Sequence, residues 1–176
     1  MTFAVPSALS GTWYVATNSA TDGPGTAWSN AFWTIQGAVD AASSNDTVLV
    51  TNGVYDTGST KMPDYHYCLN RVMITNDITV RSVNGPTVTH IVGDEATGGG
   101  NGSGAVRGVY MSAGMLSGFT ITNGYTRRIG HSDYDKSGGC VNMYGGSGAI
   151  SNCVLTGGCA ASGGGSAYGT LIDCTL

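Results

Sequence analysis

The sequence predicts an all-β solenoid, a parallel β-helix of about five rungs with an amphipathic capping helix at its N-terminal end. Three observations support this prediction. Short β-branched runs alternate with Gly, Asn and Ser turns, one segment recurs at an offset of 21 residues, and a helical period occurs once, before the repeats begin. A rung of three short strands and tight turns needs about 20 to 25 residues, which matches the shortest repeat.

The composition fits one domain of ordinary size, spanning residues 1–176, and excludes several classes of function. Gly accounts for 29 residues, and charged residues make up only 10% of the chain. The 7 Lys and Arg residues and the net charge of −4 provide no basic stripe for a nucleic acid. No apolar stretch of about 18 residues predicts a membrane span. An apolar content of 41% favours a packed core over disorder.

Residues 1–46 are interpreted as an N-terminal strand followed by the capping helix. The strand signal covers residues 13–15, and the helix is predicted at 31–43 with Ser29 or Asn30 as its N-cap. The apolar face of the helix, at i, i+3, i+4 and i+7, is formed by Ile35, Ala38, Val39 and Ala42. Because a terminal repeat of a solenoid must be covered, we expect this helix to cap the first rung.

Residues 47–176 are interpreted as the solenoid rungs. The clearest repeat pairs 150–155 with 171–176, an earlier copy covers 116–121, and weaker copies cover 48–50 and 78–80. Aligned in this way, the copies predict two inward-facing ladders, Val48, Ile78, Phe119, Cys153 and Cys174, and, two residues on, Val50, Val80, Ile121, Leu155 and Leu176. The ladders predict a narrow apolar core of stacked side chains, with Cys153 and Cys174 as buried thiols.

Each predicted strand is followed by a turn, a polar loop and a returning strand. The polar loops cover residues 56–70, 93–105, 125–138 and 157–163. The returning strands cover residues 71–74, 107–111, 140–144 and 167–168. Because the loops recur at the same corner of the coil, we expect residues 60–68, 94–105 and 125–137 to lie side by side and to form one composite surface.

Four segments of the first 55 residues carry a resemblance to a known family. Residues 11–18, 22–26, 33–42 and 46–55 read GTWYVATN, DGPGT, WTIQGAVDAA and DTVLVTNGVY. This order resembles the N-terminal module of secreted bacterial right-handed parallel β-helix proteins, the pectate-lyase-like solenoids. The resemblance implies a right-handed coil and an extracellular or cell-surface location, although residues 1–10 contain no signal peptide. It implies no single activity, because that superfamily includes lyases, hydrolases, tailspikes and passive surface repeats.

The loop at 125–137 concentrates the charged side chains that could carry chemistry. The resemblance implies that a lyase would hold Ca²⁺ with acidic residues and use Arg or Lys as a base. The candidate catalytic residues are Asp133, Asp135, Arg127, Lys136 and His131. The two aspartates could instead act as acid and base on a glycoside. The alternative is a solvated loop with internal salt bridges.

Other polar and aromatic residues near the same corner are candidates for binding. The candidate ligand-binding residues are Asp64, Tyr65, His66, Tyr67, Arg128 and Tyr134, because aromatic rings beside polar groups can stack on sugars. The candidate metal ligands are Asp94, Glu95, Asp133 and Asp135. The alternative is that the tyrosines pack back over the solenoid and that Asp94 and Glu95 lie in a loop tip.

Two functions are predicted. The first is a non-catalytic extracellular structural protein, requiring no cofactor, that self-associates into an oligomer or end-to-end fibre through an uncapped last rung at Cys174, Thr175 and Leu176. It is favoured by the low charge and by outward strand positions without carboxylates. The second is a carbohydrate-active module, either a polysaccharide lyase, a glycoside hydrolase or a glycan binder, acting around Asp133 and Asp135 with Ca²⁺ as its cofactor.

Overall fold

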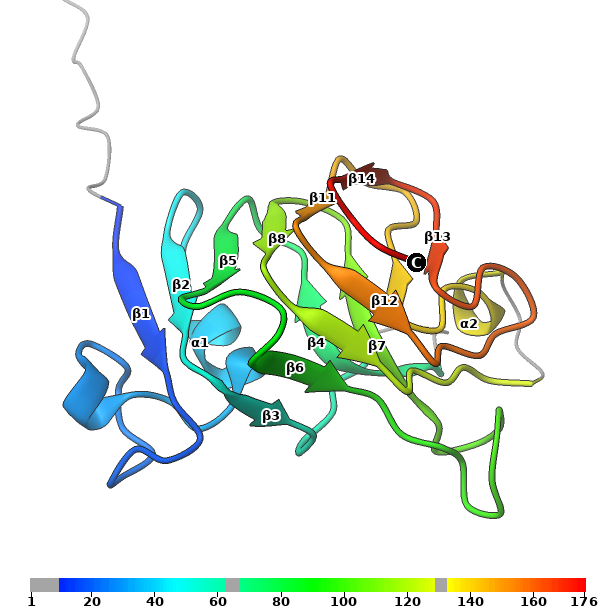
Figure 1. The fold of residues 1–176 in the computed structure, drawn as a ribbon, viewed down its shortest axis with the longest axis horizontal. Helices are drawn as coiled ribbons and strands as arrows, with labels where there is room; N and C mark the ends of the chain where they lie inside the picture. The colour runs from blue at the N-terminus through cyan, green and yellow to red at the C-terminus, as the bar shows by residue number, and fades with distance from the viewer. Residues whose placement is uncertain (1–9, 63–66, 129–132) are drawn as a thin grey trace, which may run out of the picture.

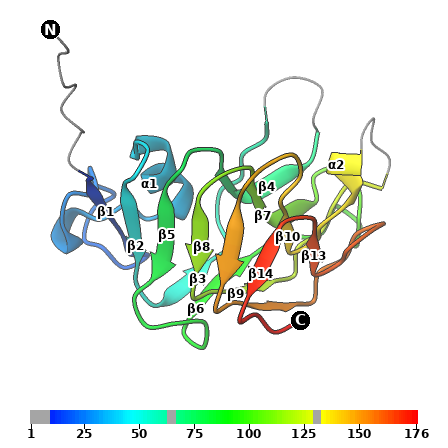
Figure 2. The same cartoon turned by 90° about the horizontal axis from the view of Figure 1, so that it is seen from above.

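The strands wind into a parallel β-helix in a computed structural model that describes residues 10–62, 67–128 and 133–176 (Figures 1 and 2). Sheet A contains, in order, β1 (Thr12–Val15), β2 (Thr47–Val50), β5 (Thr79–Ser82), β8 (Met115–Ser117), β11 (Ala149–Ser151) and β14 (Thr170–Ile172). Sheet B contains β3 (Gly53–Tyr55), β6 (Thr89–Val92), β9 (Thr120–Thr122) and β12 (Val154–Thr156). Sheet C contains β4 (Leu69–Ile74), β7 (Val106–Met111), β10 (Val141–Asn142) and β13 (Ser166–Ala167).

Each turn of the coil passes from sheet A to sheet B and then to sheet C. The described strands form four complete turns, with β1 before the first turn and β14 after the last. All pairings between these strands are parallel. The predicted parallel β-helix is therefore confirmed, with a rung count close to the expected one.

The predicted alignment of the core ladders is correct for the late repeats and wrong for the early ones. In sheet A, Val48 pairs with Val80, Val80 pairs with Leu116, and Leu116 pairs with Ile150. Phe119, which the prediction aligned with Val48, instead precedes β9 of sheet B. The error arises because both sheets show the same alternation of apolar and polar residues, so a period of two cannot separate them.

The turn from sheet A to sheet B explains why the late repeats are so regular. One residue at this turn adopts a left-handed backbone conformation in the last three rungs, with φ values of +82° at Gly118, +48° at Asn152 and +50° at Asp173. Gly, Asn and Asp are the residue types that tolerate this conformation best. In these three rungs the turn therefore selects one of these three residue types.

The capping helix is confirmed, but it is shorter than predicted. Helix α1 covers Ile35–Ala41, and its N-cap is Thr34, whose side-chain oxygen accepts a hydrogen bond from Gly37 N at 3.2 Å. The predicted caps Ser29 and Asn30 lie instead in the 3₁₀ turn η1 (Trp28–Asn30). The apolar face of α1 is buried in the same core as the first strands.

The same N-terminal segment also occupies the free edges of the first rung. The side-chain amide of Gln36 acts as a substitute strand, because its Oε1 accepts from Met73 N at 2.7 Å and its Nε2 donates to Met73 O at 3.4 Å. On sheet A, Phe32 N donates to Tyr14 O and Ala16 N donates to Phe32 O, both at 2.9 Å. These bonds satisfy strand groups that would otherwise be open to another chain.

Asp46 fastens the cap to the first strand. Its carboxylate accepts hydrogen bonds from Trp13 Nε1 at 2.9 Å, Ser43 N at 2.9 Å and Gly11 N at 2.5 Å. These three donors, that of Trp13 foremost, lower the pKa of Asp46 below its ordinary value, although partial burial opposes them. The charged carboxylate therefore connects Gly11, which precedes β1, with Ser43, which follows α1.

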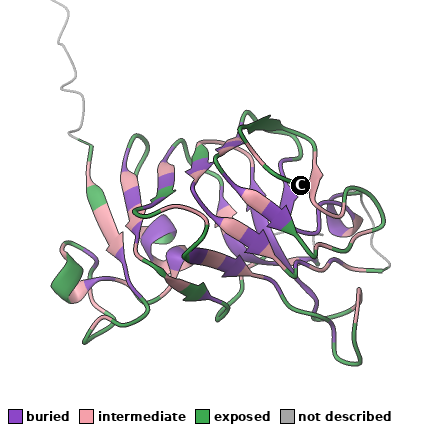
Figure 3. Cartoon of the chain, in the orientation of Figure 1, coloured by how far each residue is buried: buried purple, intermediate pink, exposed green. Residues whose placement is uncertain are grey.

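The core is a column of mainly aliphatic side chains enclosed by the three sheets, and buried residues occur in all three sheets (Figure 3). All five cysteines are free thiols. Cys68, Cys140 and Cys153 are buried, Cys174 is half-buried and Cys159 is exposed. Burial raises the pKa of Cys153 to about 11, so this thiol behaves as a small apolar side chain. Within the described part of the chain, no helix has the length and apolar character needed to cross a bilayer.

Candidate functional site

The long loops leave the coil at one corner, where sheet B passes into sheet C. They connect β3 to β4, β6 to β7, β9 to β10 and β12 to β13. Neighbouring loops bond to one another, because Gly102 N donates to Thr126 O at 3.0 Å and Ala161 N donates to Lys136 O at 2.8 Å. The described parts of the loops therefore form the composite surface that the sequence predicted.

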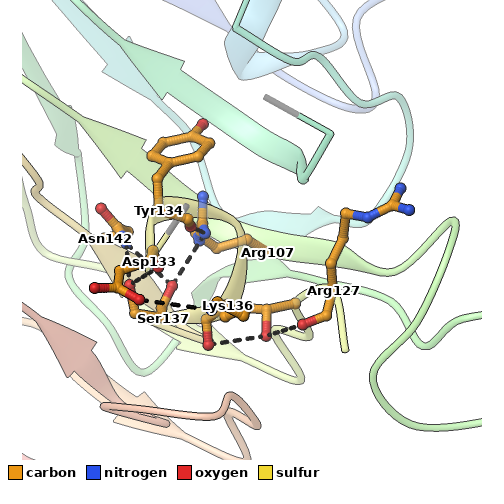
Figure 4. A network of polar contacts seen from close by, with 8 residues as sticks. Arg107, Arg127, Asp133, Tyr134, Lys136, Ser137 and Asn142 are labelled. Carbon is orange, nitrogen blue, oxygen red and sulfur yellow. Dashed lines mark hydrogen bonds and ion pairs between the residues drawn. The ribbon is translucent and has the colours of Figure 1, made fainter. Parts of the chain in front are cut away.

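A fully buried arginine organises this corner (Figure 4). Arg107 lies in β7, and its Nε donates to Gly138 O at 2.9 Å while its Nη1 donates to Asn70 Oδ1 at 2.7 Å. Its Nη2 donates to the carbonyl oxygens of Tyr134 and Ser137. One guanidinium thus joins β4, β7 and the loop between β9 and β10.

Asp135 lies in the short helix α2 (Asp133–Lys136) and is also fully buried. Its Oδ1 accepts from Tyr67 N at 2.9 Å and from Cys68 N at 3.0 Å, whereas its Oδ2 has no hydrogen-bond partner among the described residues. The carboxylate therefore connects two loops that are separated by almost 70 residues of sequence. This contact gives Asp135 a structural role.

The other residues of α2 face different surroundings. Asp133 is exposed and forms an ion pair with Lys136, at 3.6 Å from Nζ to Oδ1. Tyr134 is buried against Tyr110, with ring centroids 4.8 Å apart, and burial raises its pKa to about 12. An acid and a base that act on one glycosidic bond must face it from two sides. Catalysis by Asp133 with Asp135 stays a prediction, and their geometry does not favour it.

The remaining candidate residues of this corner are spread along the loop surface. Tyr67 is exposed, and the guanidinium of Arg127 lies 5.3 Å from the centroid of its ring. Arg127 and Arg128 line a hollow of about 220 Å³ together with Gly102 and Ser103. The candidates Asp64, Tyr65, His66 and His131 lie outside the described residues.

The predicted association edge lies at the last rung. Thr175 bonds to the edge of β12, because Thr175 N donates to Cys153 O at 2.9 Å and Leu155 N donates to Thr175 O at 2.8 Å. Cys174 is half-buried beside the core, and Leu176 is 70% exposed. Two of the three residues thus continue the coil, and the third projects from it.

An open cleft lies at the base of the loops. It has a volume of about 360 Å³ and is lined mainly by polar side chains from three consecutive rungs. Its lining residues are Asp56, Arg71, Val92, Gly93, Asp94, Glu95, Asn123 and Tyr125. Rungs repeat every ~4.8 Å along the coil axis, so the cleft presents polar groups in a regular series.

Arg71 is the one cation of this cleft, and the protein backbone fixes its side chain. It is almost completely buried, its Nε donates to Val92 O at 2.7 Å, and its Nη1 donates to Gly58 O. Burial lowers the pKa of Arg71, and the charges of Asp94 and Asp56 partly offset this effect. The hydrogen bond between Tyr125 and the Glu95 carboxylate raises the pKa of the Tyr125 hydroxyl.

The cleft does not gather the ligand set of a calcium site. Ca²⁺ takes six to eight oxygen ligands at short range. Among the residues that the structure describes, no three His, Cys, Asp or Glu side chains lie close enough to share one ion. The four candidate metal ligands are accordingly divided, because Asp94 and Glu95 lie in the cleft while Asp133 and Asp135 lie in α2. The described residues do not fit the Ca²⁺ site that the resemblance implied, and no chemical step is derived through the ion.

Sequence reasoning missed Asp56, Arg71, Asn123 and Tyr125 as site residues. A signal for three of them was present, because Asp56, Asn123 and Tyr125 each follow the end of a sheet B strand by one to three residues. Asp94 and Glu95 occupy the same position after β6. A correct alignment of sheet B would have placed all five side chains at one corner.

Comparison with known proteins supports the fold and leaves the activity open. No protein-family model and no curated protein matches the sequence. A solved structure of a pectin methylesterase mutant in complex with a hexasaccharide resembles the chain, with a TM-score of 0.55 and 18% identity. The likeness covers 95% of this chain and 49% of the other, so the chain spans about half the length of that protein. At this identity the likeness establishes a right-handed parallel β-helix and nothing further about function.

Proposed function

We propose that the chain is a carbohydrate-binding β-helix module that holds a glycan along the cleft between Asp56 and Tyr125. The observation that carries this proposal is the position of the cleft across three consecutive rungs. The rung spacing of ~4.8 Å is comparable to the length of one pyranose unit, so successive rungs can address successive sugars. A repeating surface is suited to a repeating ligand.

The chemistry of the cleft favours a neutral or amino-sugar glycan over a polyuronate. Asp56, Asp94 and Glu95 can accept hydrogen bonds from sugar hydroxyls, and the ring of Tyr125 can stack on a sugar face. These three carboxylates outnumber the single guanidinium of Arg71, which is already bonded to two carbonyl oxygens. A uronate would therefore meet net negative charge unless a cation bridges the two.

The pectin methylesterase comparison is consistent with this proposal, because that protein carries the same fold and holds a hexasaccharide. A carbohydrate-binding role also agrees with an extracellular or cell-surface location, where polymeric glycans are found. Cleavage of the glycan as a lyase or hydrolase stays a prediction for this chain.

We expect Asp94→Asn to weaken glycan binding by about two- to tenfold, because it removes a charged acceptor worth on the order of 1 kcal/mol. Isothermal titration with neutral, amino-sugar and galacturonate hexamers, each with and without Ca²⁺, measures the effect. Asp77→Asn, at an exposed carboxylate outside the cleft, is the matched control. Unchanged affinity in Asp94→Asn, or no binding of any hexamer, would contradict the proposal. Tighter binding of galacturonate than of the other hexamers, with or without Ca²⁺, would contradict the preference for a neutral or amino-sugar glycan.

Self-association is the second candidate function, and the surface of the last described rung favours it. Leu171, Ile172 and Leu176 are exposed there, and strand β14 carries the colour of exposed residues in Figure 3. An end-to-end fibre needs a second open edge, and at the first rung Phe32 and Gln36 already occupy strand edges. Association through the last rung would therefore form a pair of chains, tail to tail.

We expect Leu176→Asp to shift such a pair fully to monomer, because each chain would bury an unpaired charge in the interface. Sedimentation velocity over a hundredfold range of concentration measures the equilibrium. Val54→Asp, which adds the same charge at an exposed apolar position of β3, should leave it unchanged. A wild-type chain that stays monomeric throughout this range rules out self-association.

A further inference from the structure

Two exposed tyrosines form an aromatic shelf at the end of sheet C. Tyr144 and Tyr168 follow β10 and β13 on consecutive rungs, and about half of each residue is exposed. Their ring centroids lie 5.2 Å apart at an interplanar angle of 72°, which is an edge-to-face contact. The shelf shares no lining residue with the cleft between Asp56 and Tyr125.

The backbone at Tyr168 is held in an unfavourable conformation. Its φ is +65°, and the next residue, Gly169, has φ +74°. Gly169 occupies the register position of Gly114, directly before its sheet A strand, and the preceding rung has its positive φ at Gly145. Tyr168 is therefore an additional residue at positive φ in this turn. A bulky aromatic residue at positive φ costs folding free energy, and such residues concentrate at functional sites.

The shelf is anchored to the buried network around Arg107. Tyr110, whose hydroxyl donates to Tyr144 O at 3.2 Å, packs its ring against Tyr134. Tyr144 N donates to Asn142 Oδ1 at 2.9 Å. The backbone of Tyr144 is therefore held by Tyr110 and Asn142, which belong to the same buried network that positions α2.

A second cleft opens directly beside the shelf. It has a volume of about 300 Å³, and Tyr168 forms one wall. The other lining residues are Asp133, Lys136, Ser137, Ala161 and Ser162. The exposed Asp133 forms an ion pair with the half-buried Lys136, so hydrogen-bonding groups of both signs border an aromatic ring. This combination suits a polyhydroxylated ring, which has apolar faces and polar edges, better than it suits an apolar peptide.

We propose that Tyr144 and Tyr168 form the stacking platform of a second glycan-binding surface, with Asp133 and Lys136 bonding the sugar hydroxyls. The ligand class is a neutral glycan with flat ring faces, such as a β-1,4-linked glucan. This surface goes beyond the binding assigned to the first cleft, and it accounts for an aromatic residue at a backbone position that favours Asn or Gly.

The test is Tyr168→Asn, which removes the ring while keeping a residue that accepts positive φ. Titration with cellohexaose is expected to show affinity weakened by about two- to tenfold, and maltohexaose, whose chain is curved, is expected to bind more weakly to the wild type. The Tm should stay within about 2 °C of the wild type or rise, because relief of backbone strain offsets the lost ring contact. Trp28→Ala, which removes an exposed ring from the edge-to-face pair with Tyr14, is the control.

Two results would overturn the inference. Unchanged cellohexaose affinity in a folded Tyr168→Asn chain would remove the platform. A Tm lowered by more than about 4 °C, together with lost binding, would show that the ring stabilises the fold and does not contact the glycan. Asp94→Asn separates the two surfaces: if it abolishes cellohexaose binding and Tyr168→Asn does not, the first cleft holds the glycan and only the second surface is refuted.

Discussion

Replacing Arg107 with methionine is expected to destabilise the protein by about 4 kcal/mol or more, which is a large share of the roughly 5–15 kcal/mol that stabilises a typical domain. The guanidinium donates to the carbonyl oxygens of Gly138, Tyr134 and Ser137 and to Asn70 Oδ1, and all of these bonds are buried. Methionine leaves three acceptors without these donors, Gly138 O, Tyr134 O and Asn70 Oδ1, whereas Ser137 O keeps the hydrogen bond from Asn142 Nδ2. Each buried unsatisfied group costs about 1–3 kcal/mol. Denaturation by urea measures the loss.

Arg81→Met is the matched control for this prediction. Arg81 lies in β5, the sheet A strand of the same rung, but its side chain is exposed, so we expect a change within about 0.5 kcal/mol. Arg107→Lys should also destabilise strongly, because an ammonium cannot reach four acceptors in a planar fork. A change of less than about 1 kcal/mol in Arg107→Met would show that water replaces the lost donors and that Arg107 does not organise the corner.

The repeat was readable from the sequence because a stacked coil imposes the same demand at every turn. The 21-residue offset between Ile150 and Leu171 corresponds to one complete passage through sheets A, B and C. The turn that needs a left-handed residue recurs with it, at Asn152 and Asp173. The repeat offset and the recurring turn, both local features of the sequence, therefore predict the fold class and the corner from which the loops project.

The composite site was less predictable because it depends on contacts between distant loops. The sequence places Arg107 in a predicted returning strand, and it does not show that the loop around Gly138 buries the guanidinium. Asp135 was predicted to be a catalytic carboxylate because the sequence does not show which groups it contacts. Its hydrogen-bond donors, Tyr67 N and Cys68 N, lie far away in the sequence. The concentration of charged residues in the loop indicated a candidate site. It could not distinguish a carboxylate that holds two loops together from one that reacts with a substrate.

Gly124→Ala is expected to destabilise the protein by about 3 kcal/mol or more, even though it adds a single methyl group. A Cβ at Gly124 would lie 1.9 Å from Gly139 O and 2.9 Å from Gly108 N, far inside ordinary contact distance. These neighbours are backbone atoms, Gly139 across the corner of the same rung and Gly108 in the preceding rung, so no side chain can rotate away to make room. Gly93 and Gly158, on the rungs before and after, face the same restriction from backbone atoms.

Gly165→Ala provides the control, because the nearest atom to its added Cβ lies at 3.5 Å and no strained conformation is required. We expect it to change stability by less than about 0.5 kcal/mol in the same urea titration. Gly124 also stands between Asn123 and Tyr125, so the backbone shift that relieves the clash should displace both cleft residues. Gly124→Ala should therefore weaken glycan binding at temperatures where the chain is still folded. Wild-type stability and affinity in this variant would contradict the prediction. The backbone at this corner would then move apart easily to admit a methyl group, and the close packing of glycines would not position the cleft.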